Sequence, residues 1–303
     1  MRFDFEYDPE KAAKIAEITV FRGSYDDVLS NKIVKIPEGI VEIAENAFRD
    51  FESLEEIEFP KSLRRIGASA FSGCGNLKKI TMQNGVEEIL DEAFSSCPSL
   101  TELILPDSVK VIGEGAFEGC ASLTRLKLSE SIYKIGASAF AFCFNLTHLT
   151  VPDSCFLIEF SAFSSCFSLE SVKLSASMPL IDESTFEGCR SLKEVDLPTK
   201  LVKIGRRAFK GCSSLASLII PVETRSIGFD AFAGCTSLRR IALPKDLCDI
   251  EDEEAFDCCD ALTDISFGGT KQAWDTLTRR KTLTLRHTDG SVSSPKISFM
   301  NLK

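Results

Sequence analysis

The sequence predicts a solenoid of stacked repeats. A unit of 23 residues, typified by residues 105–127 (LPDSVKVIGEGAFEGCASLTRLK), recurs ten times between residues 36 and 266. Every copy contains a Phe, an Ala precedes nine of these, and a Leu follows six residues after each. A fixed period of about 20–50 residues is typical of solenoids, because one unit cannot bury its apolar face alone. The repeat phenylalanines are Phe48, Phe71, Phe94, Phe117, Phe140, Phe163, Phe186, Phe209, Phe232 and Phe256.

Before the repeats, residues 1–35 predict an N-terminal cap. Asp8 and Pro9 suit the N-cap and first position of a short helix, and the strand-like ITVF follows. An open solenoid end would expose apolar core, so an atypical terminal unit is expected. The first residues lack the apolar segment of a signal peptide. This predicts a cytoplasmic protein as the sequence stands, and a cell-surface or secreted one if a leader was removed.

Within a repeat, we expect two short extended segments and a turn. Residues 100–105 alternate towards their end and predict a strand, which Pro106 ends because proline donates no N–H. Val109 and Ile112 predict a second extended segment with both side chains inward, and Gly113 turns it. Residues 114–120 predict a single helical or 3-10 turn that places Ala116 and Phe117 in the core.

Nine of the 12 cysteines occupy one repeat position, three residues after the Phe. Equivalent side chains in a solenoid point in parallel, whereas a disulfide needs converging Cβ atoms. The first repeat has Phe51 at this position, as a buried apolar site would allow, so we predict a ladder of buried free thiols. Cys155, Cys248 and Cys258 fall outside the ladder and are the candidates for reactive thiols. The ladder comprises Cys74, Cys97, Cys120, Cys143, Cys166, Cys189, Cys212, Cys235 and Cys259.

The repeat pattern LxxIxLPxxVxxIGxxAFxxC resembles the BspA-type leucine-rich repeat and covers about three quarters of the chain. The resemblance implies a right-handed α/β horseshoe-type leucine-rich-repeat solenoid with a parallel sheet on its concave side. It also implies a bacterial family associated with cell surfaces, adhesion and protein binding. The departures are mild: Met82-Gln83 replaces Leu-Pro, Ser175 replaces Pro, and the tenth copy has an extra residue before Phe256.

After the repeats, residues 267–303 predict a C-terminal cap, so that caps and repeats form a single elongated domain. Repeat arrays of this type often end in a similar GT…W unit, here residues 269–274, and we expect Trp274 to close the last core layer. TLTLRH, a turn at residues 288–290 and SVSS predict a hairpin that closes the sheet edge.

Composition and motifs argue against several functions. The formal charge of −10 disfavours nucleic acid and anionic membranes, and no apolar run of about 18 residues predicts membrane insertion. No nucleotide loop, metalloprotease helix or nucleophile elbow occurs, so we predict no cofactor, no metal and no enzyme. Residues 252–254 (DEE) suggest a solvated charge run. An enzyme would require His148 or His287, the two histidines, to meet a Ser or Cys and an acid in space.

The side chains at the outward positions of the predicted concave face do not pack in the core. One column begins Glu56, Lys79, Glu102, Arg125, and its alternating signs predict a self-paired ladder. Around repeats four to six the face becomes cationic to neutral, and we expect its cations to be unmatched by nearby acids of the same face. We predict a monomeric protein-binding module that engages an acidic protein surface there, in adhesion or host interaction. The alternative is an intracellular scaffold, and a self-associating structural protein is disfavoured by the caps. The predicted binding residues are Arg125, Lys127, His148, Thr150 and Lys173.

Overall fold

A computed structural model describes residues 32–251, 253–278 and 284–299. The helix predicted after Asp8 and the strand that follows it lie outside the described residues. The chain divides into two compact units, Met1–Thr147 and His148–Lys303. Each unit is a parallel β-solenoid, as the repeat pattern predicts.

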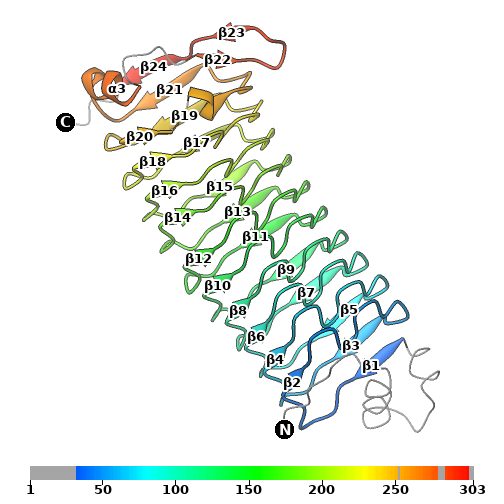
Figure 1. The fold of residues 1–303 in the computed structure, drawn as a ribbon. Helices are drawn as coiled ribbons and strands as arrows, with labels where there is room; N and C mark the ends of the chain where they lie inside the picture. The colour runs from blue at the N-terminus through cyan, green and yellow to red at the C-terminus, as the bar shows by residue number, and fades with distance from the viewer. Residues whose placement is uncertain (1–31, 252, 279–283, 300–303) are drawn as a thin grey trace. The chain divides into compact units, whose positions relative to one another are not determined.

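The first unit carries a set of three-residue strands and a set of two-residue strands on opposite sides of its coil (Figure 1). Strands pair in parallel with their equivalents one repeat away, so Ile57 lies between Val34 and Ile80. The long strands are β1 (Ile33–Lys35), β3 (Glu56–Glu58), β5 (Lys79–Thr81), β7 (Glu102–Ile104) and β9 (Arg125–Lys127). The short strands are β2 (Glu42–Ile43), β4 (Arg65–Ile66), β6 (Glu88–Ile89), β8 (Val111–Ile112) and β10 (Lys134–Ile135).

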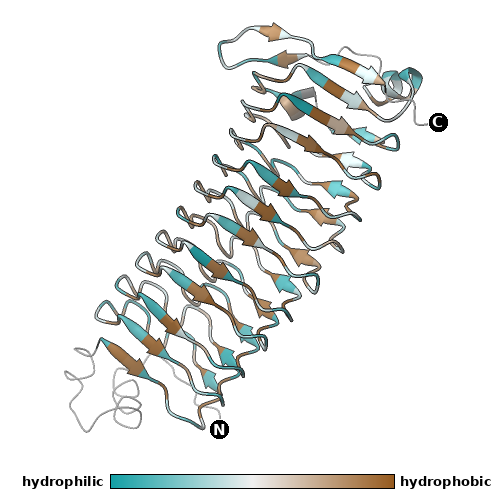
Figure 2. Cartoon of the chain, turned by 180° about the vertical axis from the view of Figure 1, so that it is seen from behind, coloured by the Kyte–Doolittle hydropathy of each residue, from teal (hydrophilic) through white to brown (hydrophobic). Residues whose placement is uncertain are grey.

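The second unit repeats this arrangement. In β13 and β17 the central residue is buried and the flanking residues are turned outward. Figure 2 shows that the long strands combine hydrophilic and hydrophobic residues. The long strands are β11 (His148–Thr150), β13 (Ser171–Lys173), β15 (Glu194–Asp196), β17 (Ser217–Ile219), β19 (Arg240–Leu243) and β21 (Asp264–Phe267). The short strands are β12 (Leu157–Ile158), β14 (Leu180–Ile181), β16 (Lys203–Ile204), β18 (Ser226–Ile227) and β20 (Asp249–Ile250).

The segment after the short strand differs from the expected helical turn. Over residues 114–120 the backbone forms consecutive turns, because Gly115 and Gly119 adopt left-handed φ angles of 57° and 71°. The N–H groups of Gly115, Phe117 and Gly119 donate to carbonyl oxygens of the next repeat at 2.8–2.9 Å instead of closing a helix. Among the described residues, a 3-10 helix occurs only in the tenth repeat (η1, Glu253–Phe256), which has the extra residue.

The phenylalanine ladder forms the core of both units. Phe94 stacks nearly parallel between its neighbours, with ring centroids 5.0 and 5.3 Å apart, and Phe209 does the same at 5.6 and 5.5 Å. Both rings are fully buried. These spacings are close to the ~4.8 Å separation of neighbouring strands, so each ring contacts one ring on either side.

The cysteine ladder is buried and free in the structure, as predicted. Each thiol lies against the backbone of an adjacent repeat: Cys97 Sγ donates to the carbonyl of Phe71, and Cys212 Sγ to that of Phe186, both at 3.3 Å. Burial raises the pKa of Cys120 to about 12, so this thiol stays protonated and can donate. The ladder therefore serves packing and backbone hydrogen bonding.

The C-terminal cap begins with helix α3 (Lys271–Leu277), whose N-cap Thr270 accepts a hydrogen bond from Ala273 N through its hydroxyl oxygen at 3.1 Å. Trp274 on this helix is buried, and its ring centroid lies 5.4 Å from that of Phe267. The predicted closure of the last core layer by Trp274 is confirmed.

The predicted hairpin forms, but it does not close the sheet edge. Strands β22 (Leu285–Arg286) and β23 (Val292–Ser293) pair with each other in an antiparallel two-stranded sheet. The long-strand sheet is instead extended by β24 (Lys296–Phe299), which pairs in parallel with β21. The physical reason is the sequence KISF, whose alternation matches the DISF of β21 and sets like residues side by side.

Candidate protein-binding face

The long-strand face of the first unit is largely paired with itself. Its outward charges alternate in sign from strand to strand, and parallel register places opposite charges next to each other. Arg125, predicted to be unmatched, is instead paired with Glu102 and is removed from the set of free cations. The ion pairs on this face are Lys35–Glu58 at 2.9 Å, Glu56–Lys79 at 3.6 Å and Glu102–Arg125 at 2.6 Å.

A further cluster flanks this face at Glu55. Its carboxylate lies 2.6 Å from Lys32 Nζ and 2.7 Å from Lys78 Nζ, which come from the repeats on either side. Hydrogen bonds from these two ammonium groups lower the pKa of Glu55 to about 2. The first unit therefore matches cations to acids both on the strands and beside them.

The long-strand face of the second unit is different. Register places Lys173 beside Asp196, and Arg240 beside Asp264, yet neither pair closes into an ion pair. Asp264 instead accepts a hydrogen bond from Ser298 Oγ at 3.0 Å. Among the described residues Lys173 thus forms no ion pair, although Asp196 is the next residue in its column. Both charges are nevertheless exposed and face solvent separately.

The predicted binding residues fall into two groups. Arg125 and Lys127 lie on β9 in the first unit, where Lys127 is exposed beside Ile104. The others lie in the second unit, where β11 and β13 place Thr150 beside Lys173. His148 Nδ1 lies 2.8 Å from Ser171 Oγ, so this histidine has a polar partner on the neighbouring strand. The second group is continuous with β15, whose Asp196 lies beside Lys173.

Ile219 is the residue of this face that sequence reasoning missed. It points outward from β17 between Asp196 and Ala242 in its column and is 77% exposed. Val222, in the turn that follows, is 75% exposed. The signal was present in the sequence as an apolar residue in an outward column. The face therefore offers an apolar contact flanked by unpaired charges, a combination found at protein–protein interfaces.

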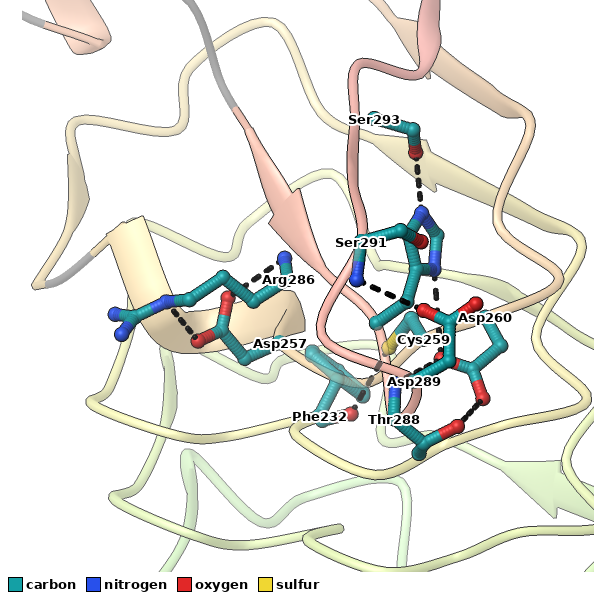
Figure 3. Close-up of polar contacts among 10 residues, drawn as sticks. Phe232, Asp257, Cys259, Asp260, Arg286, Thr288, Asp289, Ser291 and Ser293 are labelled. Atoms are coloured by element: carbon teal, nitrogen blue, oxygen red, sulfur yellow. Dashed lines mark hydrogen bonds and ion pairs between the residues drawn. The ribbon is translucent and has the colours of Figure 1, made fainter.

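A second cluster lies in the C-terminal hairpin (Figure 3). Ser293 Oγ is 2.6 Å from His287 Nε2, and His287 Nδ1 is 3.4 Å from Asp260 Oδ1. Asp260 also accepts hydrogen bonds from the N–H and hydroxyl of Thr288, at 3.0 and 2.6 Å. The Thr288 hydroxyl is the main cause of the lowered pKa of Asp260, which stays ionised. A serine, a histidine and an acid thus meet, the arrangement that the sequence left open at His287.

The remaining candidates carry no chemistry of this kind. Cys155 is buried, and burial raises its pKa to about 11, so it does not supply an accessible thiolate. Cys258 is partly exposed with a raised pKa, chiefly from desolvation, and Cys248 is exposed. No group of three or more potential metal ligands occurs among the described residues. In the same part of the chain, no helix is long and apolar enough to cross a bilayer.

Three solved structures of leucine-rich-repeat proteins are similar to this chain. A leucine-rich-repeat protein from Treponema pallidum is 32% identical over 61% of this chain and 78% of that one, with a TM-score of 0.47. A leucine-rich cell surface protein from Faecalibacterium prausnitzii is 28% identical over 81% of both chains, with a TM-score of 0.45. A leucine-rich-repeat protein from Bacteroides ovatus is 22% identical over 89% of this chain and 92% of that one, with a TM-score of 0.46. No curated protein matches the chain.

The strand columns and apolar ladder define a leucine-rich-repeat protein. The family model for the BspA type leucine-rich-repeat region matches residues 21–147, 87–216 and 157–277. These matches together span most of the sequence, and the chain belongs to this family. Leucine-rich-repeat proteins are typically protein-binding modules and are generally not enzymes.

Proposed function

We propose that this chain binds a protein partner through its long-strand face. The observation that carries the proposal is the exposed, unpaired set of charges around Ile219 in the second unit. Unpaired charges can meet a partner without first breaking an internal ion pair, and an exposed apolar residue supplies desolvation energy at the centre of an interface.

The partner's contact surface is acidic where it meets the cations of the long-strand face of either unit. Lys173 with Thr150 and His148 forms the cationic to neutral part of the second unit, and Lys127 is the unpaired cation of β9 in the first. Arg125 contributes less, because its ion pair with Glu102 must be broken or shared. Complementary charges chiefly set the encounter rate and the specificity.

Two biological settings suit such a module. Adhesion or host interaction would place it at a cell surface, whereas scaffolding would place it inside the cell. Mass-spectrometric identification of the native N-terminus in fractionated cells separates them. A processed N-terminus in the surface fraction supports adhesion, and an unprocessed one in the cytosolic fraction supports a scaffold.

The binding face is tested with a partner captured by the full chain and identified by cross-linking mass spectrometry. Cross-links should concentrate on β11 to β19, and Ile219→Asp should weaken binding of the purified partner. Lys79→Glu is the control, because Lys79 also points outward from a long strand but has an internal partner in Glu56. Cross-links on the turns or the C-terminal hairpin, with normal binding by Ile219→Asp, would refute the proposal.

A further inference from the structure

We propose that Ser293, His287 and Asp260 form a nucleophile, base and orienting acid that make Ser293 an acylatable serine, with carboxylic esters as its substrate class. The site lies in the C-terminal hairpin of the second unit, away from the long-strand positions assigned to partner binding. It uses residues that the repeat does not specify. The inference is independent of the proposed binding function.

The hydrogen bond between serine and histidine carries the argument. At 2.6 Å, Ser293 Oγ and His287 Nε2 are within the range required of a nucleophile and its general base. Nε2 can accept the hydroxyl proton only if Nδ1 carries the ring proton. The carboxylate of Asp260 faces Nδ1 and favours that tautomer. At 3.4 Å its contact is longer than an optimal N–H···O bond of ~2.9 Å, so Asp260 acts mainly through its charge.

The surroundings hold this geometry in place. Thr288 donates two hydrogen bonds to Asp260, and His287 N donates to Ser291 O at 2.8 Å across the hairpin turn. Arg286, the residue before the histidine, forms ion pairs with Asp257, at 3.0 Å from Nε to Oδ2, and with Glu254. These contacts fasten the hairpin to the last repeat. The base is therefore positioned by the fold before any substrate arrives.

Access favours reaction at the serine. The His287 side chain is 15% exposed, whereas Ser293 is exposed at the end of β23. A surface position of this kind suits small or unbranched esters better than substrates that need an enclosing pocket.

The reaction balances without a further reactant except water. Ser293 Oγ attacks the ester carbonyl carbon while its proton passes to His287 Nε2, giving a tetrahedral intermediate. The bond to the leaving alcohol then breaks, and Nε2–H returns the proton to that alcohol. Water attacks the acyl-serine with His287 again acting as base. This releases a carboxylic acid and restores the Ser293 hydroxyl.

The test is the rate of covalent labelling of the full chain by a fluorophosphonate, with peptide mass spectrometry to locate the label. General-base assistance is worth about 10²–10⁴-fold, so Ser293 should react at least ~100-fold faster than Ser291 in the same turn. Labelling of Ser293 should slow by at least ~100-fold in His287→Gln, because the general base is lost. Hydrolysis of p-nitrophenyl acetate should be lost in Ser293→Ala and retained in Ser291→Ala.

Controls separate chemistry from structure. Trp274 is the single Trp of the chain and sits in the same cap, so its fluorescence reports whether each variant keeps the cap folded. Asp260→Asn should slow labelling of Ser293 relative to that of Ser291 in a folded cap. Equal labelling of Ser293 and Ser291, or labelling of Ser293 unchanged in a folded His287→Gln variant, overturns the proposal and leaves His287 as a structural bridge.

Discussion

The long-strand faces of the two units share one backbone pattern but treat their charges differently. In the first unit, most outward cations form ion pairs with carboxylates of the neighbouring strand, as Arg125 does with Glu102 at 2.6 Å, and Lys127 is the exception. In the second, Lys173 and Asp196 occupy equivalent neighbouring positions and do not close. The core beneath is the same in both, a stack of buried phenylalanines. The difference is therefore confined to the surface.

This comparison teaches that the repeat register brings charges together but does not decide whether they pair. An exposed ion pair contributes about 0–1 kcal/mol to the free energy of unfolding, so the protein loses little stability when two such charges stay unpaired. The consequence for binding is larger. A partner that meets the first face must compete with internal pairs, whereas the second face presents charges and Ile219 directly.

The largest expected effect tests whether the two cores are alike. Phe94→Ala in the first unit and Phe209→Ala in the second should each lower the free energy of unfolding by about 3–5 kcal/mol, because each ring is buried between two others. The same cost applies to the buried Phe140 and Phe163. Urea unfolding followed by circular dichroism measures it.

The terminal copy supplies the control for this prediction. Phe48 belongs to the first repeat, stacks on Phe71 at 4.9 Å and is only partly buried, so Phe48→Ala should cost less. If Phe48→Ala proved as costly as Phe94→Ala, nearest-neighbour stacking would not govern stability.

The next effect concerns binding. Reversing Lys127 and Lys173 to Glu should slow association with the acidic partner about tenfold and weaken the salt dependence of the rate. Thermal stability should change little, because exposed strand residues away from ion pairs carry little folding energy. Stopped-flow or surface-based kinetics at two salt concentrations provide the measurement.

Glu56→Lys should show the reverse behaviour. Glu56 pairs with Lys79 inside the first face, so its reversal should cost a little stability and leave association unchanged. Normal association by the Lys127 and Lys173 variant would move the partner site away from these strands.

A smaller effect addresses pairing itself. A double-mutant cycle on Glu102 and Arg125, each changed to Ala, should give a coupling energy of about 0.2–1 kcal/mol that decreases with salt. The matched cycle on Lys173 and Asp196 should give a coupling near zero. Equal couplings in the two cycles would remove the contrast between the faces.

The repeat made the core predictable almost residue by residue. One period places Phe, Ala, Cys and Leu in columns, and parallel stacking then buries each column. The conformation of the turn after the short strand was not predictable from the sequence. Its left-handed backbone positions include Ser69 and Glu92, and these residue types do not mark a left-handed conformation. Outward columns predicted the Glu56–Lys79 pair, but rotamers decide whether Lys173 reaches Asp196.

The hairpin site lay beyond sequence reasoning for a different reason. Asp260 belongs to the last repeat, whereas His287 and Ser293 belong to the cap, and no period relates them. The docking of β22 on η1, together with the pairing of β22 and β23, brings the three together. The pairing of β24 is not evident from the sequence, because KISF follows the predicted hairpin and does not lie one repeat period after DISF.

The smallest expected effect is a pH-dependent change in the stability of the first unit, where Glu55 is paired with two lysines. The pKa of Glu55 is lowered from 4.5 to about 2 by hydrogen bonds from Lys32 and Lys78. A carboxylate whose folded pKa is depressed adds stability that is complete above the unfolded pKa and is lost as pH falls through the folded one.

Glu55→Gln should therefore destabilise the protein at pH 7, and the difference from wild type should shrink between about pH 4.5 and pH 2. Solvent screening keeps the effect small, since all three side chains are partly exposed. Glu52→Gln is the control for loss of an exposed carboxylate, because no ion pair among the described residues holds the Glu52 side chain. The measurement is the urea unfolding midpoint of each variant and of wild type at several pH values. A Glu55→Gln difference that persisted at pH 2 would show that the two lysines do not hold this carboxylate.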